Sequence, residues 1–183
     1  VLAAGCGSAG LPGLPEPVRP PIRPVKGQIL RLRLPGAYRQ ALSRTLRGLS
    51  RGSSVYLVPR ADGELVVGAT VEELADHSVT AGGVYQLLRA AHEVFPLVAE
   101  LELVETTAGV RPGTPDNAPL LGPTELPGLV LATGHYRNGI LLAPITADLV
   151  TELLVTGALP DLAKPFQLDR FVPKRVGELS RTG

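Results

Sequence analysis

The alternation of apolar and polar positions predicts β-strands in the first two thirds of the chain. Residues 25–34 alternate in this way, as expected of a strand with one buried and one solvated face. Residues 54–58 and 64–69 are rich in β-branched and aliphatic side chains, and the segment 59–63 between them contains Pro and Asp-Gly, which are typical of a hairpin turn. Residues 101–105 alternate again. This part of the chain therefore favours an antiparallel sheet.

Helical spacing is present in two segments. In residues 82–95 apolar side chains recur every three or four positions, and Pro96 ends the pattern. Residues 144–156 have similar spacing, with a proline in the first turn and Gly157 directly after the end. The continuous apolar run 129–133 indicates a strand that is covered on both faces. These elements predict a mixed α/β fold with an antiparallel-rich sheet and a flanking helix.

Glycine and proline mark the interruptions between these elements. Residues 11–24 contain six prolines, which exclude a regular helix or a central strand, so we interpret this stretch as a crossing between two structural units. Residues 1–4 are a short apolar run, like a buried strand reaching its carboxyl end. Residues 109–127 predict a long loop, and the tail from residue 159 predicts irregular structure.

Composition narrows the class of protein. The chain has 183 residues, and 44% of them are apolar, which is enough for a sizeable core. The single cysteine excludes an intramolecular disulfide and a cysteine-cluster metal site, and it fits a reducing compartment such as the cytoplasm. No apolar run approaches the ~20 residues of a membrane span. Methionine is absent even at position 1, so we expect a piece of a longer chain.

Charge is distributed unevenly along the chain. Residues 17–61, the basic block, contain ten basic residues and no acidic one, although the net charge of the whole chain is only +1. The ten are Arg19, Arg23, Lys26, Arg31, Arg33, Arg39, Arg44, Arg47, Arg51 and Arg60. A block of this kind could contact phosphates, or it could be a solvated loop and strand face. Few aromatic residues accompany it, which disfavours a base-stacking surface.

Three familiar catalytic or binding patterns are poorly supported. Residues 5–10 satisfy G-x-G-x-x-G, but prolines follow at once, so the helix that would bind a pyrophosphate cannot begin there. A strand end with a glycine-rich exit explains them better, and that exit could still lie near a cofactor. His77, His92 and His135 lack metal-ligand spacing, and no nucleophile elbow is present.

The most informative residues are two arginines in loops that glycine and proline constrain. Arg111 lies in the predicted loop 109–127, and Arg137 lies between the apolar run 129–133 and a predicted helix. Loops at strand ends commonly carry binding sites. A guanidinium presents two parallel donors that suit a carboxylate, and a helix N-terminus beyond Gly139 suits an anion. The alternative is a surface loop with two solvated arginines.

Residues 134–144 resemble the C-terminal flavin loop of the D-amino-acid oxidase family, in particular that of the glycine oxidases of the thiamine pathway. Three other stretches are also similar to this family: residues 23–28, the hairpin within 55–70, and residues 109–114. The family's Rossmann domain, with the true G-x-G-x-x-G, has no counterpart here, so the chain is similar to the C-terminal half of such an enzyme. The resemblance implies four segments: 1–20 as the late strand and exit of the FAD domain, 21–116 as the substrate-binding domain, 117–157 as the return to the FAD domain, and 158–183 as a tail.

The resemblance also implies roles for particular residues. Arg111 would grip the substrate carboxylate, Arg137 would support it beside the flavin, and Tyr56 would line the pocket. The loop around the isoalloxazine would comprise Gly134, His135, Tyr136, Arg137, Asn138, Gly139, Ile140 and Leu141. The positive end of the following helix would face the flavin N1/C2=O edge.

The implied reaction is oxidation of an amine next to a carboxylate, with hydride transfer to FAD and reoxidation by O2 to H2O2. Related sarcosine oxidases attach FAD to a cysteine whose matching position here is about Gly109, so we expect noncovalent FAD. We also expect a small amino-acid substrate, a homo-oligomer when complete, and neither nucleic acid nor membrane as a partner. The alternatives are a D-amino-acid oxidase or dehydrogenase, a sarcosine oxidase, or a noncatalytic module that binds nucleic acid or another anion through the basic block.

Overall fold

The computed structural model describes residues 1–38 and 41–171, and it divides the chain into two compact units. The central unit comprises residues 24–110, and the split unit comprises residues 1–23 together with residue 111 onward. The boundaries expected from the sequence lay after residues 20 and 116. Arg39 of the basic block and the last residues of the predicted tail lie outside the described residues.

A five-stranded sheet dominates the central unit, with strand order β2-β3-β4-β1-β5. The pairs β1–β4, β2–β3 and β3–β4 are antiparallel, so the predicted antiparallel sheet is confirmed. The strands are β1 (Arg23–Arg33), β2 (Leu46–Ser50), β3 (Ser53–Pro59), β4 (Glu64–Gly68) and β5 (Glu102–Gly113). The hairpin β3–β4 was predicted, whereas β2 was missed.

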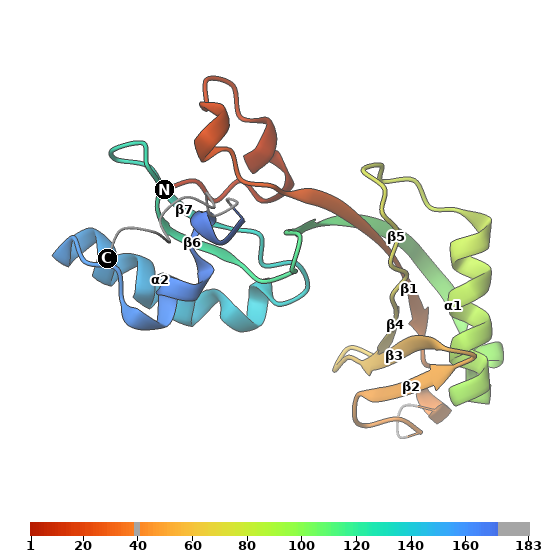
Figure 1. Cartoon of the computed structure of the whole chain (residues 1–183). Coiled ribbons are helices and arrows are strands. Elements are labelled where there is room, and N and C mark those ends of the chain that lie inside the picture. Colours follow the sequence, from red (N-terminus) through yellow and green to blue (C-terminus); the bar gives the residue numbers. More distant parts are fainter. Residues whose placement is uncertain (39–40, 172–183) are drawn as a thin grey trace, which may run out of the picture. The chain divides into compact units, whose positions relative to one another are not determined.

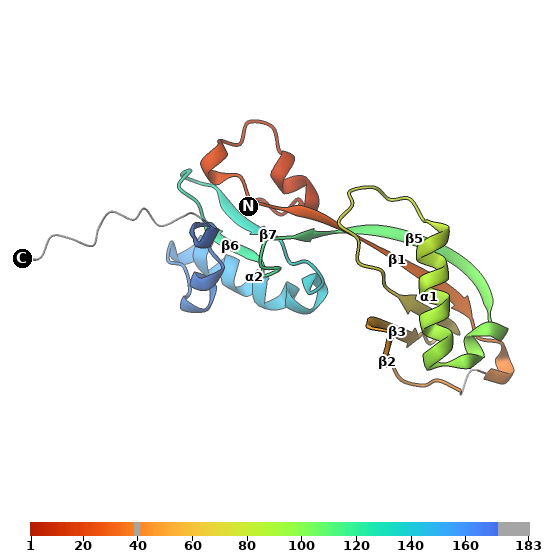
Figure 2. The ribbon, with the colours of Figure 1, turned by 45° about the vertical axis from the view of Figure 1, so that its right-hand side comes forward.

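Helix α1 (Ala81–Val94) lies along one side of this sheet (Figures 1 and 2). Its buried residues Leu87 and Ala91 pack with Leu30, Leu57 and other inward-facing strand residues in one apolar core. The predicted flanking helix is therefore confirmed, and its apolar stripe faces the sheet as the spacing indicated. The opposite face of β3 carries Tyr56, because successive side chains on a strand alternate between faces.

The split unit is built on a small antiparallel pair, β6 (Leu120–Pro123) and β7 (Val130–Thr133). Leu2 forms a parallel bridge to Leu131 of β7, so the start of the chain lies beside that strand. Helix α2 (Gly139–Thr156) packs on β6 (Figure 1). Leu120 and Leu131 are fully buried here, which confirms the prediction of a covered strand at 129–133.

Helix α2 begins five residues before the predicted start at Pro144. The proline lies inside the helix, where its missing N–H removes only the bond that the carbonyl of Ile140 in the exposed first turn would accept. At the other end Gly157 adopts a left-handed conformation with φ 74°, and its N–H donates to the carbonyl of Leu153. The predicted glycine stop is confirmed.

By length and composition α2 could cross a membrane, contrary to the expectation from the sequence. It is the one helix among the described residues that meets this criterion, with 18 residues and a mean hydropathy of 1.6. Pro144 and Asp148 interrupt the apolar run in the sequence, but the helix continues through both residues. A single helix of this kind is weak support for a membrane segment, because helices of soluble proteins meet the same criterion.

Three other expectations are wrong in part. Residues 1–4 do not form a strand, and only Leu2 among them is paired and buried. The region 109–127 is not one long loop, because β5 extends to Gly113 and β6 begins at Leu120. The tail contains two short 3-10 helices, η5 (Asp161–Phe166) and η6 (Leu168–Phe171), in place of wholly irregular structure.

Much of the basic block is neutralised by carboxylates that are distant in sequence. Arg31 lies 2.8 Å from Glu64 and 2.9 Å from Glu105, and the buried Lys26 lies between Glu72 and Asp76. Arg33 and Arg51 also pair with distant carboxylates, whereas Arg19 pairs with the nearby Glu16. The basic and acidic parts of the sequence therefore meet in the fold, and the one-sided charge of residues 17–61 is compensated at these positions.

Candidate functional site

The candidate site is positioned by two chain segments that end side by side in the split unit. Because Leu2 and Leu131 pair in parallel, the chain leaves both segments at the same end. Gly5 follows the first with φ 55° and Gly134 follows β7 with φ 75°, so each segment turns away through a left-handed residue. The carboxyl ends of adjacent parallel strands are a common place for ligand sites.

Buried hydroxyl groups hold these two exits together. The Oγ of Ser8 and the Oγ1 of Thr133 lie 3.0 Å apart, and the Thr133 hydroxyl lies 3.4 Å from the carbonyl oxygen of Gly5. Ser8 lies in the 3-10 helix η1 (Gly5–Gly10), which contains the G-x-G-x-x-G match. Leu11 after it is extended, so no pyrophosphate-binding helix begins at Gly10, as the sequence analysis argued.

Gly134 is required by its surroundings as well as by its conformation. A Cβ at this residue would lie 2.6 Å from the Cγ2 of Thr114 and 3.2 Å from the Cδ1 of Ile22. Thr114 is fully buried directly beneath the turn. We call residues 113–119 the support loop. Because Thr114 packs against Gly134, the support loop lies directly against the first residue of the predicted flavin loop.

The predicted flavin loop lies beside the strand that carries Arg111. The backbone N–H of Tyr136 donates to the carbonyl oxygen of Pro112 over 3.0 Å. Tyr136 has φ 51°, an unfavourable backbone conformation for a bulky residue, which the hydrogen bond to Pro112 helps to hold. Arg111 is half-buried, and Arg137 is exposed on the turn. The structure thus brings together both predicted arginines and residues 134–141 in the split unit.

The N-terminus of α2 is open to a ligand. Its N-cap residue, Asn138, makes no side-chain capping hydrogen bond. The first N–H groups of a helix have no partner within the helix, and they carry partial positive charge. Ile140 is 96% exposed and Leu141 is 79% exposed on this first turn. The helix end therefore presents both anion-binding N–H groups and apolar surface.

His135 contributes a neutral ring to the same turn. Its Nε2 lies 3.0 Å from the Oγ1 of Thr146 on α2, which joins the turn to the helix. Burial lowers the pKa of His135 below its ordinary value, because the charged imidazolium is poorly solvated there. The ring is therefore uncharged at neutral pH, and the positive charge at this end of the site comes from the arginines and the helix.

Tyr56 lies in the central unit, on β3 opposite Gly68 of β4. Its ring occupies the space beside Gly68, where a Cβ would lie 2.3 Å from the Tyr56 hydroxyl oxygen. Gly68 was not recognised in the sequence, since only the cross-strand register reveals the contact. The role of Tyr56 as a pocket residue stays a prediction.

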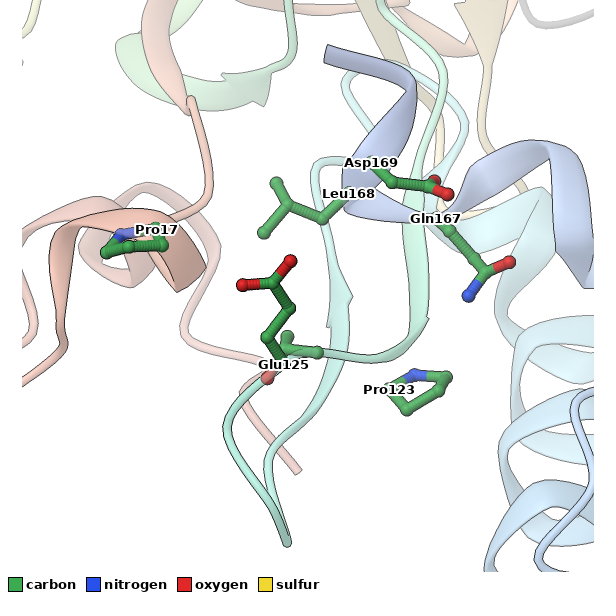
Figure 3. Close-up of a pocket in the computed structure, with 7 residues that line it drawn as sticks. Pro17, Pro123, Glu125, Gln167, Leu168 and Asp169 are labelled. Carbon is green, nitrogen blue, oxygen red and sulfur yellow. The ribbon is translucent and has the colours of Figure 1, made fainter. Parts of the chain in front are cut away.

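Two hollows in the split unit differ in character. One, of about 290 Å³, is lined by Pro17, Pro123, Glu125, Leu168 and Asp169 among others (Figure 3). Its two carboxylates disfavour an anionic ligand, and it contains no predicted site residue. The second, of about 510 Å³, lies between residues 116–121 and the apolar side chains of α2.

The described residues offer little support for metal or cysteine chemistry. Across residues 1–38 and 41–171 no three His, Cys, Asp or Glu side chains are grouped to hold a metal ion. Cys6 is half-buried in η1, and burial raises the pKa of its thiol, which disfavours the reactive thiolate.

Comparison with known proteins agrees with this picture. Residues 1–153 match the model of the family described as FAD dependent oxidoreductase. The chain belongs to this family. The FAD-dependent oxidoreductases of this family include the bifunctional protein ThiO/ThiG of a Nostoc species, which is 41% identical over 152 residues, covering 82% of the chain and 23% of that relative.

A further relative of the FAD-dependent oxidoreductase family, and one solved structure, carry glycine oxidase in their names. The glycine oxidase of Geobacillus kaustophilus is 36% identical over 176 residues, which cover 95% of the chain and 45% of the relative. The crystal structure of glycine oxidase from Geobacillus kaustophilus superposes with a TM-score of 0.71 at 38% identity, over 83% of the chain and 40% of that structure. The chain spans less than half the length of these relatives.

The split unit fits the cofactor of the FAD-dependent oxidoreductase family. The uncapped N-terminus of α2 suits the electron-rich edge of an isoalloxazine, and the exposed Ile140 and Leu141 suit its apolar rings. A Cβ at Gly5 or Gly139 would meet open space or only an ordinary contact, so the backbone is accessible at both positions. The residues that would hold the flavin are those of the turn 134–138 and the first turn of α2.

Proposed function

We propose that this chain forms the substrate- and flavin-contacting part of an FAD-dependent oxidase for glycine or another small amino acid. In the reaction the amino acid, O2 and water give the oxo acid, ammonia and H2O2. The C–H bond next to the amino group is broken, the amine becomes an imine, and water hydrolyses the imine. The two electrons lost by the substrate reduce O2.

One observation carries the proposal: the hydrogen bond from the Tyr136 N–H to the Pro112 carbonyl, 3.0 Å long. It joins β5, the strand that carries Arg111, to the turn that precedes α2. Arg111 and the N-terminus of α2 therefore belong to one unit, which supports a joint role in binding a carboxylate and the cofactor. An enzyme that oxidises a carbon next to a carboxylate needs both groups close together.

The chain's own residues supply binding and electrostatics. Arg111 would bind the substrate carboxylate through two parallel N–H donors, and Arg137 would add positive charge on the same side. The N–H groups of the first turn of α2 would stabilise negative charge that develops on the cofactor without having to reorganise. Tyr56, in the central unit, is proposed as a substrate-contacting residue on the family resemblance alone. No general base is assigned, because a neutral amine needs positioning more than proton abstraction.

FAD would accept the electrons from the substrate and pass them to O2. We propose that it is held noncovalently, since the chain's only cysteine, Cys6, lies far in sequence from the position near Gly109 where related enzymes attach flavin. In the complete gene product, FAD should give absorbance near 450 nm, and denaturation should release it. A flavin adduct on the denatured protein, detected by mass spectrometry, would contradict noncovalent binding.

The proposed setting is thiamine thiazole biosynthesis in the cytoplasm, by a homo-oligomer. The relatives named ThiO/ThiG and glycine oxidase support the pathway and the substrate. A noncatalytic module that binds nucleic acid through the basic block is less well supported, because Lys26, Arg31 and other members of that block are ion-paired. We therefore propose a small amino acid, and not a polyanion, as the partner.

Substrate choice and the role of Arg111 can be tested together. We expect the complete gene product to form H2O2 with glycine, and a panel with sarcosine and D-alanine separates the alternatives within the family. Arg111→Ala should raise KM by roughly 10- to 100-fold, because hydrogen bonds to a charged group contribute about 1.5–3 kcal/mol. Arg60→Ala, which removes an exposed guanidinium from the β3–β4 turn, should leave KM unchanged.

Two results would count against this assignment. Absence of turnover with glycine, combined with activity on D-alanine or sarcosine, would move the enzyme to another member of the family. An unchanged KM in Arg111→Ala would show that the carboxylate binds elsewhere.

A further inference from the structure

We propose that Arg170, in the C-terminal tail, is a positioning residue that fixes the flavin loop through Asp116 and Thr114. The inference rests on the proposed function, since it concerns how the same site is held. Arg170 lies beyond residue 153, where the family match ends, and nothing in its local sequence marks it.

The first contact is a two-pronged ion pair between the tail and the support loop. The Nε of Arg170 donates to Oδ2 of Asp116 over 2.9 Å, and one terminal nitrogen donates to Oδ1 over 3.1 Å. The same terminal nitrogen donates to the carbonyl oxygen of Ala118 over 3.0 Å. The two parallel hydrogen bonds of this guanidinium fork fix both the position and the orientation of the Asp116 carboxylate, and with it the support loop. A single point charge would not fix the orientation.

The arginine is itself held in place. Its side chain is only 17% exposed, its other terminal nitrogen donates to the carbonyl of Gln167, and its guanidinium stacks 4.2 Å from the ring centre of Phe171. The hydrogen bonds from Arg170 are the largest cause of a pKa of Asp116 well below the ordinary range. The carboxylate is thus ionised, and the pair intact, throughout the neutral range.

Apolar packing keeps the tail close to the support loop. Leu168 and Phe171 pack against the core of Leu2, Leu120 and Leu131 in the split unit. Figure 3 shows Leu168 and Asp169 beside the chain that carries Pro123 and Glu125. Burial of these side chains offsets the conformational entropy that is lost when the tail is ordered. Little further entropy is therefore lost when Arg170 forms its ion pair with Asp116.

Thr114 connects the Arg170–Asp116 ion pair to the flavin loop. Its hydroxyl lies 2.9 Å from Oδ1 of Asp116 and 2.7 Å from the carbonyl oxygen of Ala118, the two groups that Arg170 also contacts. Its Cγ2 fills the space next to Gly134, where a Cβ would lie 2.6 Å away. A shift of the support loop therefore displaces Thr114, which packs against Gly134, the first residue of the flavin loop.

The flavin loop needs such support because its backbone is strained. Gly134 and Tyr136 both have positive φ, and in Tyr136 that conformation persists only where the surroundings enforce it. Loss of Arg170 should let residues 134–138 relax and should weaken flavin binding without unfolding the split unit.

The test measures loop order and flavin affinity separately, in the complete gene product. We expect Arg170→Ala to increase hydrogen exchange at the amides of residues 113–119 and 134–138, and to raise the FAD dissociation constant about tenfold, as for loss of a hydrogen bond to a charged group. Arg170→Lys should recover only part of the affinity, because it restores the charge but not the fork. Lys164→Ala is the matched control, since it removes an exposed ion pair of the same tail that does not reach the loop.

A double-mutant cycle decides whether Arg170 acts through Asp116. If it does, the combination of Asp116→Ala and Arg170→Ala should bind FAD no more weakly than the weaker-binding single variant, whereas additive losses would overturn the proposal. Unchanged hydrogen exchange at residues 134–138 in Arg170→Ala would also overturn the proposal. Increased exchange with an unchanged FAD dissociation constant would overturn it as well.

If Arg170→Ala does not fold, the isosteric Asp116→Asn should show both the increased exchange and the raised FAD dissociation constant. Absence of FAD uptake by the unaltered protein would contradict the proposed function. The hydrogen-exchange data test independently whether Arg170 orders the flavin loop.

Discussion

Tyr56 on β3 faces Gly68 on β4 across an antiparallel pair, and its ring occupies the space that a side chain at Gly68 would need. An aromatic ring over a strand glycine covers the exposed backbone and in turn has its own orientation fixed by that backbone. The direction in which Tyr56 points is therefore set by a residue that has no side chain. If Tyr56 lines the substrate pocket, Gly68 determines the shape of that wall.

We expect Gly68→Ala to displace the Tyr56 ring. The new methyl group would lie 2.3 Å from the Tyr56 hydroxyl oxygen, and overpacking of this kind costs about 1–3 kcal/mol. The melting temperature should fall and KM should rise. Gly82→Ala, where a Cβ meets open space, is the control.

The same substitution in a Tyr56→Ala protein tests whether the Tyr56 ring causes the lower melting temperature. In a Tyr56→Ala protein the ring is gone, so adding Gly68→Ala should lower the melting temperature little further. An equal drop in both backgrounds would show that something other than the ring opposes a side chain at Gly68.

Residues of the candidate site could be predicted where the signal is local. Arg111 and the turn 134–138 stand out because glycine, proline and arginine are clustered within a few positions. Arg170 and Gly68 do not, because their importance comes from partners more than ten residues away. Those contacts depend on strand register and tail docking, which one sequence does not encode locally.

At the scale of elements, the start of α1 is fixed by a side-chain network that the apolar spacing does not show. Thr80 is the N-cap, and its hydroxyl accepts from the N–H of Gly83 over 3.1 Å. The buried Gln28 of β1 donates to the same hydroxyl and accepts from the N–H of Thr80 over 2.9 Å. The cap therefore joins the helix to the sheet as well as satisfying the helix end.

We expect Thr80→Ala to lower the free energy of unfolding by about 1–2 kcal/mol, since it removes a cap and leaves the amide of Gln28 short of a partner. Urea denaturation followed by circular dichroism measures this. Thr80→Ser keeps the hydroxyl and should retain most of the stability. A loss in the serine variant as large as in the alanine variant would mean that the methyl group, and not the cap, is what matters.

Elements with a strong local period were predicted, and those defined by partners were not. The β3–β4 hairpin and α1 follow from alternation, a turn signal and helical spacing. Strand β2 contains Gly48 and is completed by pairing with β3, so its sequence alone does not indicate a strand. The start of α2 was missed because a proline was assigned to the first turn, whereas the helix tolerates it one turn later.

At the scale of the whole molecule, each unit contains carboxylates whose ionised form is stabilised by the fold. In the split unit this is Asp116, held by Arg170. In the central unit the hydroxyl of Ser78 and then Lys26 lower the pKa of Asp76. Burial alone would raise the pKa of Glu72, but hydrogen bonds from Thr70, Gln28 and Lys26 lower it on balance. The charge of residues 17–61 thus takes part in stability through contacts that span the sequence.

The sign of the pH dependence follows from these shifts. A carboxyl group whose pKa is lower in the folded state than in the unfolded chain contributes stability that is complete above its unfolded pKa, about 4, and is lost as the pH falls through the folded value. Lys26 acts in the opposite sense, because hydrogen bonding to Asp76 raises its pKa, so its contribution is lost only as the pH rises beyond about 10.

We therefore expect the urea midpoint to be level between about pH 7 and 8. It should fall slightly as the pH drops through about 6.5, because burial lowers the pKa of His135 in the folded state, and it should fall further below about 4, where the carboxylates of both units become protonated. Asp116→Asn and Asp76→Asn should each lower the midpoint at neutral pH and make its decline in acid shallower, because each removes one group that would otherwise take up a proton on unfolding. Asp62→Asn, in the exposed β3–β4 turn, controls for the loss of a carboxylate with no ion pair between the described side chains. If the two test variants declined as steeply as the unaltered protein, the stability against acid would have to come from other groups, and the lowered pKa values assigned to Asp116 and Asp76 would be wrong.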